Sequence, residues 1–362
     1  MAEILGLGVS HYPPLSGRDE DMANILKGRL EDPDVPAEAK DPANWPPLMQ
    51  QEWGDDDGVA GGAKHREDML RGIRKVRGAL DAFDPDIVVI WGDDQYENFK
   101  ESIIPAFCVM AYDDMSVKPW GHAGESAMFS EEDEWGGGKP NVWGETRDTE
   151  LAVRCHREAA KELATNLLEN EFDVAYAYEP NLHPGLPHAF LNSILYLDYD
   201  RKGFPYPIIP FQLNCYGRAV ISYKGFISRL ADAGRPLDPP SPTPKRVFDL
   251  GAQVARFFKE SPYRVALVAS SSWSHAFLID ETYRMQPDVE YDKEMYRAMV
   301  DADWDTWRNQ PLSRLEAAGD QEMLNWMALA GAMNELGRTC TWSDFVETYL
   351  FNSSKVSAVF EP

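Results

Sequence analysis

Cysteine and positive charge are both scarce in this sequence. Its 362 residues include only four cysteines, which lie far apart without any Cys-x-x-Cys spacing, so they are interpreted as reduced cysteines rather than a disulfide framework. Lysine and arginine number 35 against 60 aspartates and glutamates, and the formal net charge is −25. Because phosphate backbones and anionic lipids bind to basic faces, this charge argues against nucleic acid and membrane surfaces as partners.

Long apolar runs are also missing. No apolar run reaches about 18 residues, so no membrane span is expected. The first predicted strand begins at Ile4, which leaves no room for a signal peptide, and we therefore expect a cytoplasmic protein. Hydrophobic residues make up 44% of the chain, enough for a sizeable core. We expect residues 1–362 to form one domain that carries insertions at about 15–62 and 113–147.

Apolar runs of strand length alternate with segments of helical periodicity over most of the chain. This alternation is typical of an α/β fold with a central, largely parallel or mixed sheet flanked by helices, and the patterns beyond residue 291 predict a helical C-terminal part. The expected strands cover residues 4–9, 86–91, 104–112, 172–178, 206–213 and 265–270, and the expected helices cover residues 64–82, 149–169, 190–197, 245–259, 295–302, 312–318 and 321–336.

The stretch from 86 to 99 joins a buried strand to a strongly polar segment. Its apolar, β-branched first half is typical of a strand buried on both faces. Gly92 then introduces Asp93, Asp94, Gln95 and Glu97, and the first two of these follow Gly92 as a turn would. In an open α/β sheet, polar groups just past the carboxyl end of a strand lie where ligands bind. A plain turn that caps the next element is the alternative interpretation.

Three of the seven histidines occupy equivalent places in this pattern. His11, His183 and His275 each follow an apolar strand by a few residues. Because the carboxyl ends of parallel strands share one edge of a sheet, these side chains can converge there. Together with Asp94 and Gln95 they predict a metal site or an acid–base site.

Several short motifs resemble one family, the class III extradiol ring-cleavage dioxygenases, in particular the catalytic β-subunit type of protocatechuate 4,5-dioxygenase. The Ser-His-Tyr-Pro motif at 10–13 resembles the family's Ser-His-x-Pro, and the Ser-His pair at 274–275 resembles its acid–base element. The Val-Glu-Tyr-Asp motif at 289–292 resembles the segment that supplies a carboxylate ligand. His183 and the run 312–360 also follow the family, so the resemblance spans nearly the whole chain.

The resemblance implies specific roles. His11 and Glu290 would be metal ligands, His275 would be the catalytic acid–base residue, and His183 would be a second catalytic residue that contacts substrate or oxygen. It also implies Fe(II), with another divalent metal as the alternative, a small aromatic substrate and O2. Asp94 would bind substrate, and a homo-oligomer is expected.

One position departs from the family. Gln95 stands where the second iron-ligating histidine is expected, whereas non-haem iron oxygenases normally use two histidines and one carboxylate. Three outcomes are open. Gln95 can be a ligand through its amide oxygen, a neighbour such as Asp94, Glu97 or His65 can substitute, or the metal can be lost.

Three functions therefore compete. The first is a non-haem Fe(II)-dependent extradiol-type dioxygenase of aromatic catabolism, which cleaves a catecholic or related ring with O2. The second keeps the fold but uses an altered or absent metal for non-oxidative chemistry, as a hydrolase, lyase or decarboxylase acting on a small aromatic or carboxylic substrate. The third is a non-catalytic binding protein, ranked last because it gives His275 and His183 no purpose.

Overall fold

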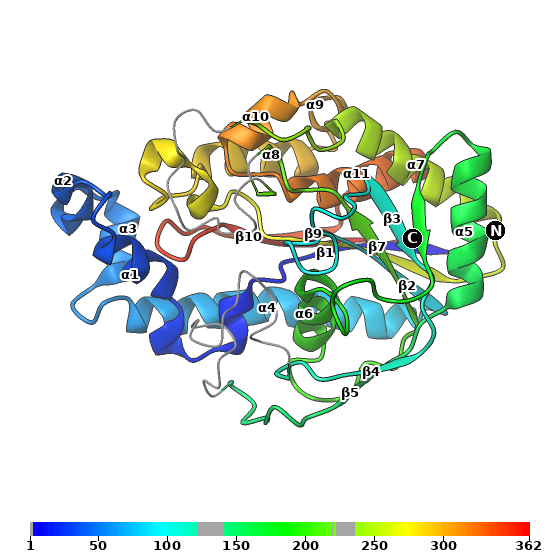
Figure 1. Ribbon diagram of the computed structural model, residues 1–362, viewed down its shortest axis with the longest axis horizontal. Coiled ribbons are helices and arrows are strands. Elements are labelled where there is room, and N and C mark those ends of the chain that lie inside the picture. Colours follow the sequence, from blue (N-terminus) through cyan, green and yellow to red (C-terminus); the bar gives the residue numbers. More distant parts are fainter. Residues whose placement is uncertain (1–2, 122–140, 219, 222–235) are drawn as a thin grey trace.

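The computed structural model describes residues 3–121, 141–218, 220–221 and 236–362 and shows a large mixed sheet between two layers of helices (Figure 1). The sheet has eight strands in the order β6-β3-β7-β2-β8-β1-β10-β9. This confirms the predicted α/β class with a mixed central sheet. Its strands are β1 (Ile4–Val9), β2 (Ile87–Gly92), β3 (Phe107–Met110), β6 (Ala175–Ala177), β7 (Ile208–Leu213), β8 (Val265–Ser270), β9 (Trp342–Val346) and β10 (Lys355–Phe360).

The middle of the sheet is parallel. β7, β2, β8 and β1 run in the same direction, and every residue of these four strands is buried. This is why they are continuous apolar runs in the sequence rather than alternating ones. β10 pairs antiparallel with β1, and β3 pairs antiparallel with β7. The parallel strands therefore end at one common edge.

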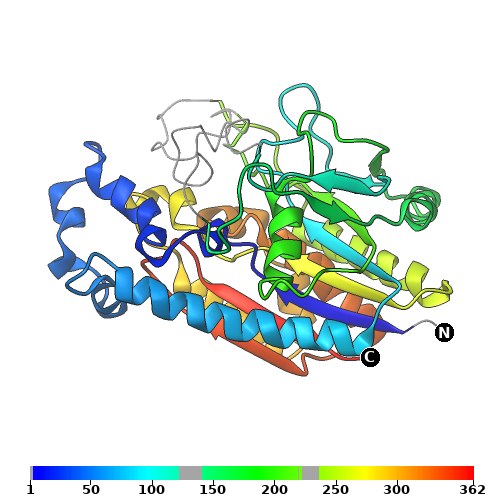
Figure 2. The ribbon, with the colours of Figure 1, turned by 90° about the horizontal axis from the view of Figure 1, so that it is seen from below.

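Helices cover both faces of the sheet. The long helix α4 and the short helix α6 lie on one face, while α5, α7 and α11 lie on the other (Figures 1 and 2). The helices are α1 (Asn24–Glu31), α2 (Ala37–Lys40), α3 (Pro47–Trp53), α4 (Val59–Phe83), α5 (Arg157–Glu169), α6 (His188–Leu197), α7 (Pro244–Glu260), α8 (Val289–Val300), α9 (Trp304–Arg308), α10 (Leu312–Ala317) and α11 (Met323–Leu336). None of the helices in the described ranges combines the length and apolar character of a membrane span.

Some predicted boundaries are wrong. Residues 151–153, expected at the start of a helix, form β5 (Leu151–Val153), which pairs with β4 (Met115–Val117) in a separate two-stranded sheet. The following helix begins only at Arg157. The proposed insertion at 15–62 contains α1, α2 and α3 and runs into the start of α4. Most of the proposed insertion at 113–147, residues 122–140, lies outside the described residues.

Close packing of α7 against α11 depends on two glycines. A Cβ atom on Gly251 would lie 1.8 Å from the carbonyl oxygen of Ala328, and one on Gly331 would lie 1.9 Å from that of Phe248. Both obstacles are backbone atoms, so no side-chain rotation can relieve the clash. The two helices can approach this closely only because both positions lack a side chain.

We expect Gly251→Ala to lower the free energy of unfolding by about 3 kcal/mol, because the overpacked helices must separate. Gly78→Ala on the exposed side of α4 is the matched control, since its Cβ would have no neighbour within 4 Å. The control should be neutral or stabilising by about 0.5–1 kcal/mol, as expected for Gly→Ala in a helix. Urea unfolding measures both values, and equal stability of the two variants would contradict the packing argument.

Candidate metal centre

The residues that follow three neighbouring parallel strands lie together at one edge of the sheet. β2, β8 and β1 are adjacent in the sheet, and Asp93, His275 and His11 follow their respective carboxyl ends. A fourth residue, Glu322, is the N-cap of α11, which packs on the same part of the sheet. The sheet edge therefore collects side chains from four distant parts of the chain.

His11, Asp93 and Glu322 form a compact cluster. One ligand atom from each lies within 4.8 Å of the others, and all three residues are buried. The arrangement provides one imidazole and two carboxylates. Such N and O donors suit a divalent transition metal.

The orientation of His11 supports a cation at this position. Its Nδ1 lies 3.1 Å from both the carbonyl oxygen and the hydroxyl of Ser270, and because the carbonyl oxygen can only accept a hydrogen bond, this environment favours a proton on Nδ1. The lone pair of Nε2 then faces Glu322 Oε2 at 3.5 Å. Two electron-rich atoms face each other here, which requires a proton or a metal between them. A backbone acceptor on the distal ring nitrogen is also typical of metal-ligating histidines.

The electrostatics of the cluster favour the metal over the proton on His11. Burial, with contributions from His188 and His275, lowers the pKa of His11 well below its ordinary value. Burial also raises the pKa of Glu322, helped by the neighbouring carboxylate of Asp93, and raises the pKa of Asp93 to about 6. Among the described residues, Glu322 Oε2 has no hydrogen-bond partner. A divalent cation would offset the cost of burying both carboxylates, so these residues fit a metal.

Gln95 lies beside this cluster. Its Nε2 donates a hydrogen bond to Glu322 Oε1 at 2.5 Å. The amide therefore orients a carboxylate. The structure thus gives Gln95 a hydrogen-bonding role beside the cluster, and its role as a metal ligand stays a prediction.

Asp94 forms the turn that follows β2. Its carboxylate accepts hydrogen bonds from the backbone N–H groups of Glu97, Asn98 and Phe99, and its Oδ1 lies 2.6 Å from the hydroxyl of Tyr216. Asp94 is fully buried, and its carboxylate accepts hydrogen bonds from the backbone of its own loop. The expected substrate-binding role is therefore replaced by the alternative of a structural turn.

Glu290 lies away from the cluster, which overturns its expected role as the carboxylate ligand. It occupies the first turn of α8, its side chain is 75% exposed, and it pairs with Lys293 at 3.1 Å. Glu322 occupies the place in the cluster that the sequence interpretation assigned to Glu290. His65 is no substitute either, because it is buried on α4 and stacks on Phe351 with ring centroids 4.8 Å apart.

His275 lies beside the metal cluster, as expected. Its Nε2 is 3.6 Å from Glu322 Oε2. Burial, assisted by the positive charge of Lys355, lowers the pKa of His275 to about 3. The imidazole is therefore neutral near pH 7.

His188 is a member of this site that the sequence interpretation did not assign, and its partner is Glu97, which that interpretation named as a possible substitute ligand. Glu97 Oε2 lies 2.8 Å from His188 Nδ1, and the ring of His188 packs edge-on against His11 with centroids 5.2 Å apart. Burial alone would lower the pKa of His188, but the carboxylate of Glu97 raises it above its ordinary value. His188 therefore differs electrostatically from His11 and His275, both of which are held neutral.

His183 reaches the rim of the same site by another route. β6 runs opposite to β1, β2 and β8, so its carboxyl end does not share their edge. The chain instead turns back, and the backbone N–H groups of residues 181–183 donate to Asn98 Oδ1. His183 Nε2 then lies 3.9 Å from Glu97 Oε1. His183 is near the site, although the shared-edge argument that predicted it does not apply to β6.

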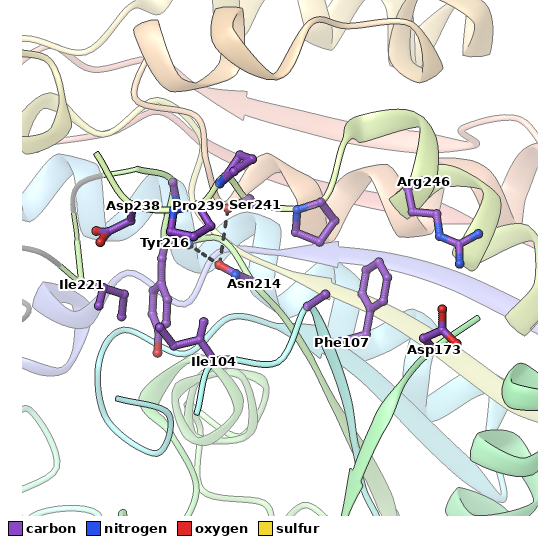
Figure 3. A pocket seen from close by; sticks show the side chains of 14 residues that line it. Ile104, Phe107, Asp173, Asn214, Tyr216, Ile221, Asp238, Pro239, Ser241 and Arg246 are labelled. Atoms are coloured by element: carbon purple, nitrogen blue, oxygen red, sulfur yellow. Dashed lines mark hydrogen bonds between the residues drawn. The ribbon is translucent and has the colours of Figure 1, made fainter. Parts of the chain in front are cut away.

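A cavity of about 440 Å³ opens beyond Tyr216 (Figure 3). Asn214 Oδ1 accepts hydrogen bonds from the Tyr216 backbone and from Ser241 Oγ at its wall. Its apolar lining includes Ile104 and Phe107. Tyr216 lines this cavity, and its hydroxyl contacts Asp94 in the turn that follows β2.

Comparison with known proteins identifies relatives. Residues 237–360 match the family described as the catalytic LigB subunit of aromatic ring-opening dioxygenase. Proteins named 2,3-dihydroxyphenylpropionate/2,3-dihydroxicinnamic acid 1,2-dioxygenase are also similar. The one from Photorhabdus laumondii is 26% identical over 208 residues, which are 58% of this chain and 49% of the relative. One from Dechloromonas aromatica is 23% identical over 282 residues, which are 72% and 80% of the two chains.

A third relative, from Pseudomonas putida, is 24% identical over 204 residues, which are 56% of this chain and 48% of the relative. The chain thus spans about half the length of two of these three relatives. The chain is thus similar to aromatic ring-opening dioxygenases, in agreement with the resemblance inferred from its sequence motifs.

Proposed function

We propose that this chain, a relative of the aromatic ring-opening dioxygenases, is a non-haem Fe(II)-dependent extradiol-type dioxygenase of aromatic catabolism. The proposal rests on the cluster of His11, Asp93 and Glu322 beside the neutral imidazole of His275. A metal site next to a proton acceptor is what cleavage of a catecholic ring with O2 requires. The proposal includes a cytoplasmic location and a homo-oligomer.

His11, Asp93 and Glu322 would hold the metal. When bound, Fe(II) supplies coordination positions for substrate and O2 and lowers the pKa of a coordinated hydroxyl. Asp93 would supply a second carboxylate in place of a second histidine ligand, and Gln95 would hold Glu322 in position through its amide. Asn325 Nδ2 contacts Asp93 Oδ1 at 3.4 Å and supports the second carboxylate.

The histidines divide the proton chemistry between them. His275 Nε2, which faces the cluster, accepts a proton from the substrate hydroxyl and returns it during ring opening. His188, whose pKa is raised by Glu97, donates a hydrogen bond to a developing negative charge on substrate or oxygen. His183 at the rim would orient the substrate.

The substrate class follows from the relatives and the donor set. A catechol chelates through two neighbouring hydroxyl oxygens, which matches a site with protein ligands on one side and a base close by. The named relatives act on 2,3-dihydroxylated phenylpropionate or cinnamate. We propose a vicinal diol on an aromatic ring as the recognised group.

Anaerobic reconstitution with Fe(II), followed by O2 and a panel of catechols, tests this function. We expect one equivalent of iron, O2 uptake, and yellow products cleaved beside the two hydroxyls. Protein loaded with Zn(II) is the control, because zinc has no redox chemistry and should give no O2 uptake. Bound iron with silence across the panel would contradict the proposal and favour the non-oxidative alternative.

A further inference from the structure

A buried lysine lies behind the candidate metal centre. Lys355 begins β10 and is only 2% exposed. Its Nζ donates hydrogen bonds to the carbonyl oxygens of Phe351 and Ser353, at 2.6 and 2.5 Å, and lies 3.6 Å from the ring centroid of Tyr12. Removing an ammonium group from water is costly unless its donors are satisfied. The side chain therefore holds a defined set of backbone acceptors.

The turn at residues 351–354, which Lys355 holds, also forms backbone hydrogen bonds with the segment at 273–276 that contains His275. The N–H of Trp273 donates to the carbonyl oxygen of Ser354 at 3.2 Å, and that of Ala276 donates to Asn352 at 2.7 Å. His275 itself faces Ser353 in an antiparallel bridge. The position of the imidazole therefore depends on the conformation of residues 351–354.

The backbone of this turn is unusual at one residue. Asn352 has a φ of +64°, in the left-handed region that most side-chain-bearing residues seldom occupy and that Asn tolerates better than most. Its side-chain Oδ1 also accepts from the N–H of Phe277, at 3.3 Å. A strained backbone persists only where the surroundings hold it, and the two hydrogen bonds from Lys355 supply that restraint.

A second brace comes from α3, inside the 15–62 segment. Glu52 Oε2 accepts hydrogen bonds from the N–H groups of Tyr349 and Leu350, at 3.1 and 3.0 Å. The carboxylate therefore holds the start of the turn that the ammonium of Lys355 holds at its end. Burial lowers the pKa of Lys355 well below its ordinary value, and the carboxylates of Glu52 and Asp292 oppose that shift.

We propose that Lys355 and Glu52 are positioning residues for His275, acting through the 349–354 turn. The proposal assigns the 15–62 segment a role in the active site, because α3 supplies one of the two braces. It rests on the proposed function only in taking His275 as the acid–base residue. Neither side chain needs to touch substrate or metal.

Hydrogen exchange measured by mass spectrometry tests the brace without any assay of activity. In Lys355→Met we expect the amides of Trp273 and Ala276 to exchange about tenfold faster, while amides in β2 keep their wild-type rates. Lys355→Arg, which keeps the charge and the donors, should restore most of the protection. Lys293→Met is the matched control, since Lys293 pairs with Glu290 and Glu347 on the surface.

Glu52→Gln is the milder second variant, in case Lys355→Met fails to fold. It keeps the shape but weakens the acceptor, so exchange should increase first at Tyr349 and Leu350 and then at Ala276. In iron-loaded protein both variants should lower kcat at least tenfold, with metal content and KM within about twofold of wild type.

The two levels of the proposal fail separately. Unchanged exchange at 273–276 in both variants, or a uniform rise over the whole chain, would overturn the brace. If exchange rises at 273–276 as expected but the protein cleaves no catechol, the brace is supported and the dioxygenase function is refuted. Local exchange with kcat equal to wild type would refute the role in positioning His275.

Discussion

Glu322→Gln is expected to abolish metal binding while leaving the metal-free fold intact. The variant removes one of two carboxylates from the cluster but keeps its volume and its contact with Gln95. Loss of even an outer partner of a metal site commonly costs 10–100-fold in affinity, so loss of a ligand should cost more than about a hundredfold. Calorimetric titration with Fe(II) under anaerobic conditions, and with Mn(II), measures the change.

Thermal unfolding gives a second test, because Glu322→Gln should change the stability in opposite directions with and without metal. Wild-type protein should gain about 2.7 kcal/mol when the metal is at a hundred times its Kd, and the variant should gain almost nothing. Without metal the variant should be the more stable protein at neutral pH. Because the folded pKa of Glu322 is raised, the metal-free wild type loses stability as pH rises above the ordinary carboxyl pKa of about 4.3.

Glu290→Gln is the matched control for this prediction. Both positions are glutamates at the start of a C-terminal helix, but Glu290 is exposed and paired with Lys293. We expect its metal affinity and activity to equal wild type. If Glu290→Gln lost metal and Glu322→Gln kept it, the assignment from the structure would be wrong and the one from the sequence pattern right.

The contrast between Glu290 and Glu322 shows that the sequence could not predict which glutamate joins the cluster. Glu290 precedes one run of helical periodicity and Glu322 lies at the start of another, and both fall within segments that resemble the extradiol family. Which helix N-terminus faces the sheet edge depends on how α8 and α11 pack, and periodicity carries no information about that. α11 packs on β8 and β1, which places its N-cap beside His11.

The successful part of the interpretation has a simple physical basis. His11 and His275 were predicted to meet because buried, β-branched runs identify parallel strands, and parallel strands end at one edge. The same argument named His183 although β6 runs the other way. Strand direction at the periphery of a mixed sheet is set by tertiary pairing, so the agreement at His183 came from the family resemblance and not from the rule.

Asp93 was hidden by the residue next to it. The departure at Gln95 directed attention to Asp94, Glu97 and His65 as substitutes, while Asp93 was taken as part of the turn. In the structure Asp93 belongs to the metal cluster, and Asp94 forms the turn. Successive residues of an extended segment point to opposite sides, so one carboxylate faces the cluster and the other faces its own loop.

His275→Asn is expected to lower kcat by 10²–10⁴-fold, the usual contribution of a general acid–base group. Its affinity for metal should stay within about threefold of wild type, because the His11, Asp93 and Glu322 cluster forms without it. This combination separates proton transfer from metal binding, since Glu322→Gln should lose both. Stopped-flow measurement with a catechol, on protein with verified iron content, gives the rate.

The pH profile of the wild type sharpens the same test. Since the pKa of His275 is lowered to about 3, its neutral form should be present throughout the range from pH 5 to 8. The wild-type rate should therefore not fall as the pH drops through the ordinary histidine pKa of about 6.5. His275→Asn should likewise show no change in its pH profile in that range. A fall of that kind in the wild type would mean that His275 titrates normally and is exposed to water during turnover. A variant with full activity would remove His275 from the chemistry and leave His188 as the proton-transfer group.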